Sequence, residues 1–343
     1  MTRGALVCTA ALTLLLGSSA GDQRVSLRST AATYLATIAT IAPVAGRETA
    51  YDYYERLTED AEALDDATVP EGYTAEQWAQ TLQRTASLDL SLATQLIDRS
   101  YAAMASVRGL GEVFVRSSQD RTMQPVAVYV PSGYAPGNPT PLIVLLHGHP
   151  QSETQLLAPA YVAQLAEANK SIVVAPWGRG YYDFRGSASD VYDALDAATH
   201  AFTIDPRKRF LAGYSMGGFS VFEVAPLHPD DWSAVMSIAG ALLGSDSARL
   251  LALMPRTPFY VLTGSADDSI PTQYPTATAI FLHNEGLDVS FYSQPGGKHR
   301  LATLMPILTQ AWNDMLHEIV RAPPAAVGKI TLPAAIPMSM TKP

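Results

Sequence analysis

The sequence contains very little cysteine and few charged residues. A single cysteine in 343 residues excludes an internal disulfide framework and any zinc site built from several cysteines. Charged residues make up 16% of the chain and hydrophobic residues 48%, which excludes a mainly disordered protein. The net charge of -9 leaves no excess of Lys and Arg to hold a phosphate backbone, so we expect no nucleic-acid partner. The length allows one large domain or two ordinary ones, with a core that needs no covalent staple.

Long apolar runs are also absent, apart from one at the N-terminus. Residues 1–20 combine the charged Arg3, an apolar run over 5–16 and a small-residue end at Ala20, which is typical of a secretory signal peptide. A helix that spans a bilayer needs about 20 apolar residues, and the apolar run over 5–16 is shorter than that. We therefore expect cleavage rather than an uncleaved anchor. Cleavage would remove both Cys8 and Arg3 and change the net charge from -9 to -10. We therefore expect a secreted protein, extracellular or periplasmic, without membrane contact after cleavage.

Helical periodicity dominates residues 27–108, which we interpret as a small N-terminal module of three helices. Apolar residues recur at helical spacing in three segments, and a capping-box pattern at Thr74–Gln77 opens the third. The second segment also carries an acidic face, which we expect to be solvated rather than to hold a ligand. The residues that define the apolar stripes are Tyr34, Leu35, Ile38 and Ile41, then Tyr51, Tyr54, Leu57 and Leu64, and finally Trp78, Leu82, Leu92 and Leu96.

Short apolar and β-branched segments alternate with helical ones over residues 109–320. Their continuous apolar runs indicate strands that are buried on both faces. The alternation predicts a doubly wound, mostly parallel α/β sheet. The expected strands cover residues 112–115, 126–130, 142–146, 172–175, 209–212, 234–238, 259–262 and 289–292. Residues 321–343 are rich in Pro and Ala, and we expect a disordered tail there.

A Gly-x-Ser-x-Gly pattern stands between one of these strands and a helical stretch. It reads Gly213-Tyr214-Ser215-Met216-Gly217 and directly follows the strand at 209–212. In a nucleophile elbow, the glycines permit a sharp turn that exposes a serine at the top of the sheet. The pentapeptide alone is a weak signal, but its position between strand and helix favours Ser215 as a catalytic nucleophile.

A serine hydroxyl needs a base that takes its proton, and that base needs a carboxylate that orients it. Among seven histidines, His299 lies in a glycine-rich loop after the last expected strand, from which it can reach over the sheet edge. Asp267 follows the strand at 259–262 and is our preferred carboxylate, with Asp268 as the fallback. The order Ser215, Asp267, His299 is the chain order of the α/β-hydrolase triad.

An oxyanion hole requires two backbone N–H donors near the nucleophile. We expect one from Met216, the residue after the serine, and one from His149, because Pro150 has no N–H group. A metal site at His147 and His149 is not expected, since no third ligand lies nearby in the sequence. We likewise expect no cofactor.

An aromatic loop follows the strand at 172–175 and could contact a substrate. Stacking of its side chains on a phenolic or sugar ring is one interpretation. Packing of the same aromatic residues on the protein's own surface is equally consistent with the sequence. The candidates are Trp177, Tyr181, Tyr182 and Phe184.

Over residues 124–317 the sequence resembles a known family. It is similar to the α/β hydrolases of the feruloyl esterase and polyhydroxybutyrate depolymerase kind, which are related to esterase D and to carbohydrate esterase family one. This resemblance implies an α/β-hydrolase fold and an ester of a plant cell-wall phenolic, an acetylated sugar or a polyester as substrate. The sequence departs from this family in two ways. Many secreted relatives carry disulfides, whereas this chain would have no cysteine after cleavage. The helical module is also not part of the usual catalytic domain. The segments that carry the resemblance are 127–134, 141–148, 204–207, 213–218, 264–267 and 296–299.

These observations predict a secreted serine carboxylic-ester hydrolase that works through an acyl-enzyme. Two alternatives stay open at this point. One is a serine peptidase of the prolyl oligopeptidase type, which shares the triad but usually carries hundreds of strand-rich residues ahead of it. The other is a catalytically silent binding module on a hydrolase scaffold. The sequence does not fix the oligomeric state.

Overall fold

The computed structural model describes residues 19–65, 68–180, 183–244, 250–318 and 332. Nearly all of the expected signal peptide, most of the expected tail, and the substrate candidates Tyr181 and Tyr182 lie outside the described residues. The first described helix begins at Ala20, the last residue of the expected signal, and Ser19 caps it.

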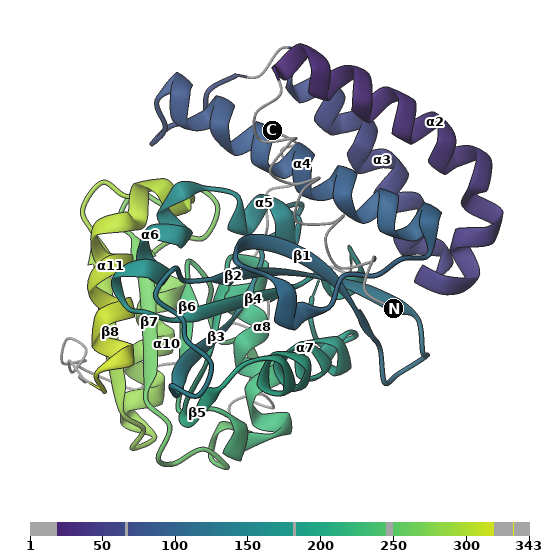
Figure 1. Cartoon of the computed structure of the whole chain (residues 1–343). Helices are drawn as coiled ribbons and strands as arrows, with labels where there is room; N and C mark the ends of the chain where they lie inside the picture. The colour runs from purple at the N-terminus through teal and green to yellow at the C-terminus, as the bar shows by residue number, and fades with distance from the viewer. Residues whose placement is uncertain (1–18, 66–67, 181–182, 245–249, 319–331, 333–343) are drawn as a thin grey trace.

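One eight-stranded sheet forms the centre of the molecule, in the order β1-β2-β4-β3-β5-β6-β7-β8 (Figure 1). The β1–β2 and β2–β4 pairs are antiparallel, and every other neighbouring pair is parallel. All eight strands expected from the apolar runs are present, so the predicted α/β-hydrolase architecture is confirmed. The strands are β1 (Gly109–Arg116), β2 (Met123–Val130), β3 (Thr140–Leu146), β4 (Ile172–Pro176), β5 (Ile204–Tyr214), β6 (Ala234–Ile238), β7 (Phe259–Gly264) and β8 (Val289–Gln294).

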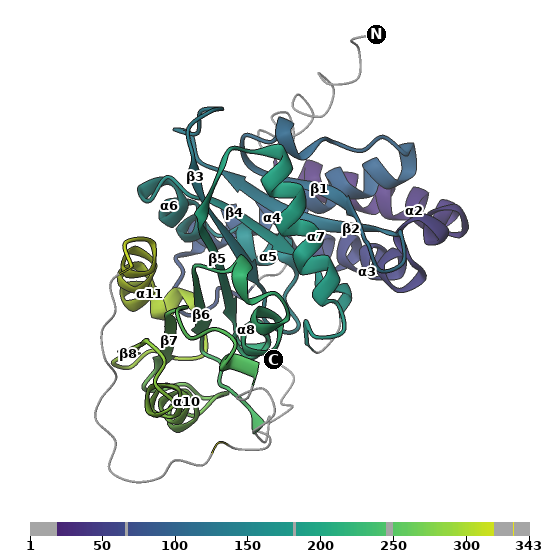
Figure 2. The same cartoon turned by 90° about the horizontal axis from the view of Figure 1, so that it is seen from below.

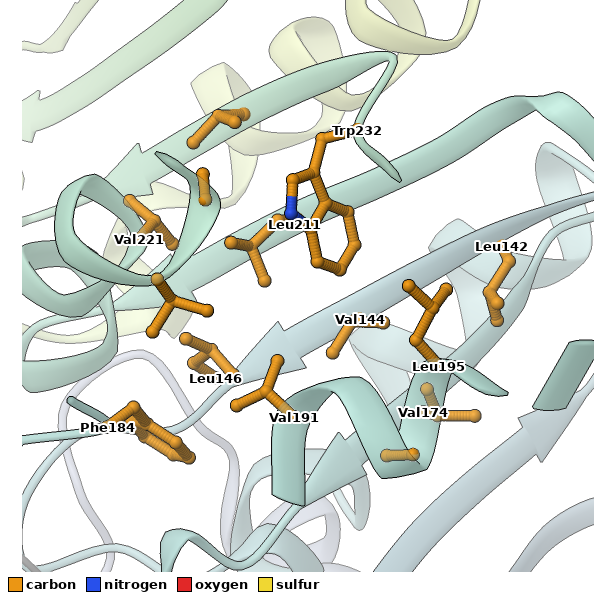
Figure 3. Close-up of a cluster of buried hydrophobic side chains, with 14 of the residues drawn as sticks. Leu142, Val144, Leu146, Val174, Phe184, Val191, Leu195, Leu211, Val221 and Trp232 are labelled. Atoms are coloured by element: carbon orange, nitrogen blue, oxygen red, sulfur yellow. The ribbon is translucent and has the colours of Figure 1, made fainter. Parts of the chain in front are cut away.

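Helices cover both faces of this sheet (Figure 2). On one face α7 (Ala188–Ala201), α8 (Met216–Val224) and α10 (Gln273–Asn284) pack on alternate strand residues, as Figure 3 shows for α7 and α8. On the other face α5 (Glu153–Leu157), α6 (Ala160–Ala168) and α11 (Leu301–Leu316) cover the intervening residues. Because successive side chains of a strand point to opposite faces, each strand contributes to both cores. Short 3-10 turns are η1 (Met104–Ser106), η2 (Gly178–Gly180), η3 (Ala225–Leu227) and η4 (Pro229–Asp231).

The N-terminal helical region lies over the β1 end of the sheet as a further layer (Figure 1). It consists of α2 (Ala20–Ala45), α3 (Arg47–Ala63) and α4 (Ala75–Asp98), and the expected capping box at Thr74 is present. Its core contains buried Tyr53, Leu57 and Leu92 and continues into Phe114 of β1 and Met123 of β2. The helical region and the sheet therefore share one apolar interface.

Two expectations for this region were wrong in detail. Leu35 and Tyr51, which we assigned to apolar faces, are exposed, and Tyr53 is buried instead. The expected solvated acidic face is also only partly present, because Asp60 is buried against α4. Among the described residues, none of the helices is both long and apolar enough to cross a membrane.

Candidate active site

Ser215 occupies a sharp turn between β5 and α8. Its backbone has φ 52° and ψ -113°, in the positive-φ region that residues with a Cβ rarely adopt. A hydrogen bond from the Ser215 N–H to the carbonyl of Ile238, at 2.8 Å, fixes the turn to the next strand. A Cβ at Gly213 would lie 2.2 Å from the carbonyl oxygen of Gly217, so the two arms of the turn approach this closely only with glycine. The Gly-x-Ser-x-Gly pattern thus forms the sharp turn that its spacing predicts.

His299 and Asp267 lie next to this serine. The Oγ of Ser215 is 2.7 Å from Nε2 of His299, and Nδ1 of the same ring is 2.8 Å from Oδ2 of Asp267. Asp267 follows β7 and His299 follows β8, and both loops stand at the carboxyl edge of the parallel sheet, where β5 also ends. The structure therefore brings together the three residues that we selected from their order in the chain.

Asp267 is held in an orientation that leaves one oxygen for the imidazole. Its side chain is 0% exposed, and its Oδ1 accepts hydrogen bonds from the backbone N–H groups of Ser269 at 2.9 Å and Ile270 at 2.6 Å. The fallback residue Asp268 is exposed, and its Oδ1 accepts a 3.4 Å hydrogen bond from the Ser269 hydroxyl. Of the two carboxylates, Asp267 is the one that faces His299.

Tyr214 holds the backbone of His299 through a hydrogen bond. Its hydroxyl donates a 2.8 Å hydrogen bond to the carbonyl oxygen of His299, and the two rings lie 5.4 Å apart. Burial and the nearby Asp267 charge raise the pKa of Tyr214, so the phenol keeps its proton and remains a donor. The histidine loop is thus bound to the residue that precedes the nucleophile.

The turn expected to supply the second oxyanion donor lies against the nucleophile turn. A Cβ at Gly148 would be 3.1 Å from the Cβ of Ser215, and the N–H of Gly217 donates a 3.0 Å hydrogen bond to the carbonyl of His147. The Met216 amide opens α8, where the helix N-terminus favours negative charge. Both proposed donors, His149 and Met216, therefore stand on adjoining turns beside Ser215.

In the aromatic loop after β4, the two described candidates follow the second of the two interpretations, packing on the protein itself. Phe184 is fully buried in the sheet core beside Leu146 and Val191 (Figure 3), so its ring is not available to a substrate. Trp177 is 8% exposed and lies between the Arg56 guanidinium, 3.9 Å from its ring centroid, and the His147 ring, whose centroid is 5.4 Å away. Both side chains pack on the protein itself.

A buried ionic cluster connects the helical region to this part of the site. Arg56 of α3 makes a bidentate ion pair with Glu153 of α5, with Nη1–Oε1 at 2.8 Å and Nη2–Oε2 at 2.9 Å. Arg56 is also 3.7 Å from the Asp89 carboxylate of α4, while Asp60 and Glu112 are buried close by. Sequence reasoning missed this cluster, and no motif in the sequence marks it.

Among the described residues, Arg56 is the cation that faces the buried carboxyl groups of Glu153, Asp89, Asp60 and Glu112, so these carboxyls differ in protonation. Burial alone would raise the pKa of Glu153, but the Arg56 charge and its hydrogen bonds hold that pKa below its ordinary value. Burial raises the pKa of Asp89 to about 6 and, together with neighbouring negative charge, raises those of Asp60 and Glu112 well above their ordinary values. Glu153 is therefore the ionised partner of Arg56.

This protonation pattern makes stability depend on pH in a defined direction. Between pH 5 and pH 8 the folded chain keeps protons on Asp60 and Glu112, and below about pH 6 also on Asp89, that the unfolded chain has released, so stability falls as pH rises. Glu112→Gln copies the protonated carboxyl and is expected to raise the Tm at pH 8 by about 2–4 °C. Glu153→Gln leaves Arg56 without its ionised partner and is expected to cost about 3 kcal/mol.

Differential scanning calorimetry of the two variants and the wild type at pH 5 and pH 8 measures this contrast. The two substitutions are chemically identical and sit in one cluster, so each serves as the control for the other. A Glu112→Gln variant less stable than the wild type at pH 8 would mean that Glu112 is ionised in the folded chain.

The helical region also reaches the loop that carries His299. Lys298 forms a 2.7 Å ion pair with Glu71, which precedes α4. The Tyr73 hydroxyl donates a 3.3 Å hydrogen bond to the hydroxyl of Tyr161 in α6. A cavity of about 390 Å³ lies between α4, α6 and α11, with Tyr73, Gln77, Tyr161 and Met305 in its wall.

In the part of the chain that the structure describes, no group of three or more His, Cys, Asp or Glu side chains could hold a metal ion.

Comparison with known proteins finds similarity to esterases over part of the chain. The family described as "Putative esterase" matches residues 117–269, which include Ser215 and Asp267 and end before His299. A bifunctional acetylxylan esterase/xylanase, XynS20E from Neocallimastix patriciarum, is 25% identical over 154 residues. That match covers 43% of this chain and 22% of the relative, so the chain spans about a fifth of the curated protein that it matches.

Solved structures with a similar fold are also esterases and serine hydrolases. A thermostable esterase has a TM-score of 0.53 at 17% identity, with 62% of this chain and 63% of that chain covered. A ferulic acid esterase has a TM-score of 0.51 at 15% identity, with 61% and 98% covered. FphF, a fluorophosphonate-binding serine hydrolase of Staphylococcus aureus, has a TM-score of 0.50 at 16% identity, with 61% and 98% covered. At these identities the likeness establishes the fold.

Proposed function

We propose that this chain is an α/β hydrolase of the esterase kind, similar to the ferulic acid and acetylxylan esterases, and that it hydrolyses carboxylic esters through a Ser215-His299-Asp267 triad. The observation that carries the proposal is the pair of hydrogen-bond distances on the His299 ring, 2.7 Å to Ser215 and 2.8 Å to Asp267. A nucleophile, a base and an orienting carboxylate in contact are the arrangement that acyl transfer requires.

In the first half of the reaction, Oγ of Ser215 forms a bond to the ester carbonyl carbon while Nε2 of His299 takes the hydroxyl proton. The carbonyl oxygen becomes an oxyanion, which accepts hydrogen bonds from the amides of His149 and Met216. Collapse of this intermediate breaks the bond to the alcohol oxygen, and His299 gives its proton to that oxygen. The alcohol leaves, and the acyl group stays on Ser215.

In the second half, water replaces the alcohol. His299 takes a proton from water, the water oxygen bonds to the acyl carbon, and the tetrahedral intermediate breaks its bond to Oγ. Oγ regains its proton from His299, and a carboxylic acid leaves. Asp267 stabilises the imidazolium in both halves, because its Oδ1 is already bound by two backbone N–H groups and its Oδ2 points at the ring.

For the substrate, we propose an ester of a phenolic acid, an acetylated sugar or a polyester. The names of two similar proteins, an acetylxylan esterase/xylanase and a ferulic acid esterase, support the first two classes. The loop after β4 no longer offers Phe184 or the buried Trp177 as stacking residues. The candidates Tyr181 and Tyr182 stay as a prediction, since they lie outside the described residues.

Two assays on the purified full chain test this function. A fluorophosphonate probe is expected to label Ser215, as located by peptide mass spectrometry, and heat-denatured protein serves as the control for labelling that does not need the fold. A panel of p-nitrophenyl acetate, methyl ferulate, acetylated xylan and polyester film then assigns the substrate class. Turnover of peptides without turnover of any ester would support a peptidase instead. Absence of both labelling and turnover would support a silent binding module.

A further inference from the structure

The helical region forms a buried ion pair with the segment that follows the predicted oxyanion turn. Glu153 is the first residue of α5 and stands four residues after His149. Its carboxylate is 0% exposed and is held by two Arg56 nitrogens and by the Tyr53 hydroxyl, which donates at 3.1 Å. Both Arg56 and Tyr53 belong to α3, so one helix of the N-terminal region fixes the far end of the turn segment.

A second path runs from the same arginine to the near end of that segment. The Arg56 guanidinium lies over the Trp177 ring, and Trp177 stacks on His147 with an interplanar angle of 19°. The Trp177 carbonyl also lies 2.6 Å from Nε2 of His147. His147 in turn accepts the Gly217 N–H through its carbonyl, which ties it to the nucleophile turn. Residues 147–153 are therefore connected to Arg56 directly at Glu153 and indirectly, through Trp177, at His147.

We propose that Arg56 is a positioning residue for the oxyanion hole, and that it holds the 147–149 turn through Glu153 and Trp177. The helical region is then a working part of the active site rather than an appended domain. This proposal rests on the esterase function proposed above. Arg56 touches neither the substrate nor Ser215, so it acts only through the turn.

This role has a kinetic signature. A displaced oxyanion donor weakens the transition state more than the bound ester, so kcat falls while KM changes little. Removal of one oxyanion donor outright costs about 10²–10³-fold in kcat. For a donor that is displaced rather than lost, we expect Arg56→Met to lower kcat about 10–100-fold. Affinity for phenylboronic acid, whose adduct with the serine carries a tetrahedral oxyanion analogue, should fall by a similar factor.

The test separates this effect from a loss of stability. Arg56→Met leaves Glu153 as a buried unpaired charge and should lower the Tm as well as kcat, whereas the double variant Arg56→Met/Glu153→Met removes both charges. We expect the double variant to regain most of the Tm while its kcat stays low, because no contact restores the hold on the turn. Arg28→Met is the matched control, since Arg28 makes an exposed ion pair with Asp65 in the same helical region. Its kcat and boronate affinity should equal those of the wild type.

All kcat values are measured with p-nitrophenyl acetate and expressed per site titrated with a fluorophosphonate. Recovery of kcat together with Tm in the double variant would overturn the positioning role and leave a structural one. An Arg56→Met variant with the kcat of Arg28→Met would overturn it also. A wild-type protein that neither reacts with the probe nor turns over an ester would overturn the proposed function, and the positioning role with it.

Discussion

Replacement of Ser215 by alanine is expected to lower the kcat for p-nitrophenyl acetate by about 10⁴- to 10⁶-fold. The substitution removes the atom that lies 2.7 Å from His299 and leaves no nucleophile at the end of β5. Alanine keeps a Cβ and the same backbone preferences, so the turn at φ 52° and the fold should persist. The measurement is initial-rate hydrolysis at saturating ester, with circular dichroism to check the fold.

Ser118→Ala is the matched control for this experiment. Ser118 is an exposed serine on the turn between β1 and β2, and its hydroxyl has no part in the proposed chemistry. It should retain the turnover of the wild type. If Ser215→Ala keeps more than a few per cent of wild-type turnover, another nucleophile is at work and the proposed mechanism is incorrect.

The second large effect is expected at Asp267. Asp267→Asn should lower kcat by about 10⁴-fold, because an amide presents the wrong hydrogen-bonding partner to Nδ1 of His299 and no negative charge to the imidazolium. The protein environment reinforces this loss, since the carboxylate is fully buried and no water can replace its charge. The hydroxyl of Ser215 then lacks a competent base even though all three side chains stay in place.

Asp268→Asn provides the control in the adjacent position. Asp268 is exposed and contacts only the Ser269 hydroxyl among the hydrogen bonds described for its side chain, so the change should alter kcat by less than twofold. A large loss in Asp268→Asn, with normal turnover in Asp267→Asn, would exchange the roles of the two carboxylates. Parallel assays of both variants at one pH decide between them.

The sheet and the meeting of Ser215, Asp267 and His299 could be predicted because each depends on a local or an ordered signal. A strand buried on both faces must be apolar at every position, so runs such as 142–146 and 172–175 are visible without any tertiary information. The three triad residues each follow a strand, and the carboxyl ends of parallel strands meet at one edge of a sheet. Their chain order therefore carried information about their positions in space.

The buried cluster around Arg56 could not be predicted for the opposite reason. Its principal ion pair joins residues 97 positions apart, and charged residues on helices are usually solvated. The spacing of Tyr51 and Tyr54 suggested an apolar face for α3, but the true interior face contains Tyr53, Arg56 and Asp60. That face is defined by partners on α4, β1 and α5, which only the folded chain brings together.

For the aromatic loop the sequence left substrate stacking and packing on the protein itself equally open, and the structure shows the second for Phe184 and Trp177. Gly178 has a positive φ, and any side chain there would press on the Phe184 ring, so the backbone curls over that ring and buries it. The same loop contains Arg179, whose guanidinium binds Asp190 and Asp120 and fastens the loop to α7 and to the β1–β2 turn. These internal contacts leave fewer loop side chains for a substrate than the sequence suggested.

The shared apolar interface between the helical region and β1 and β2 has a consequence for how the chain can be divided. Leu57 and Leu92 of the helices pack in the same core as Phe114 and Met123 of the sheet. Arg56 of the helical region forms its ion pair with Glu153, which belongs to α5. The boundary between the helical region and the sheet, near residue 108, is therefore not a position at which the chain divides into two independently packed units. A fragment trimmed to residues 117–269, the segment that the esterase family model matches, would lack the helices that supply most of that core, so we expect the smallest stable unit to include them.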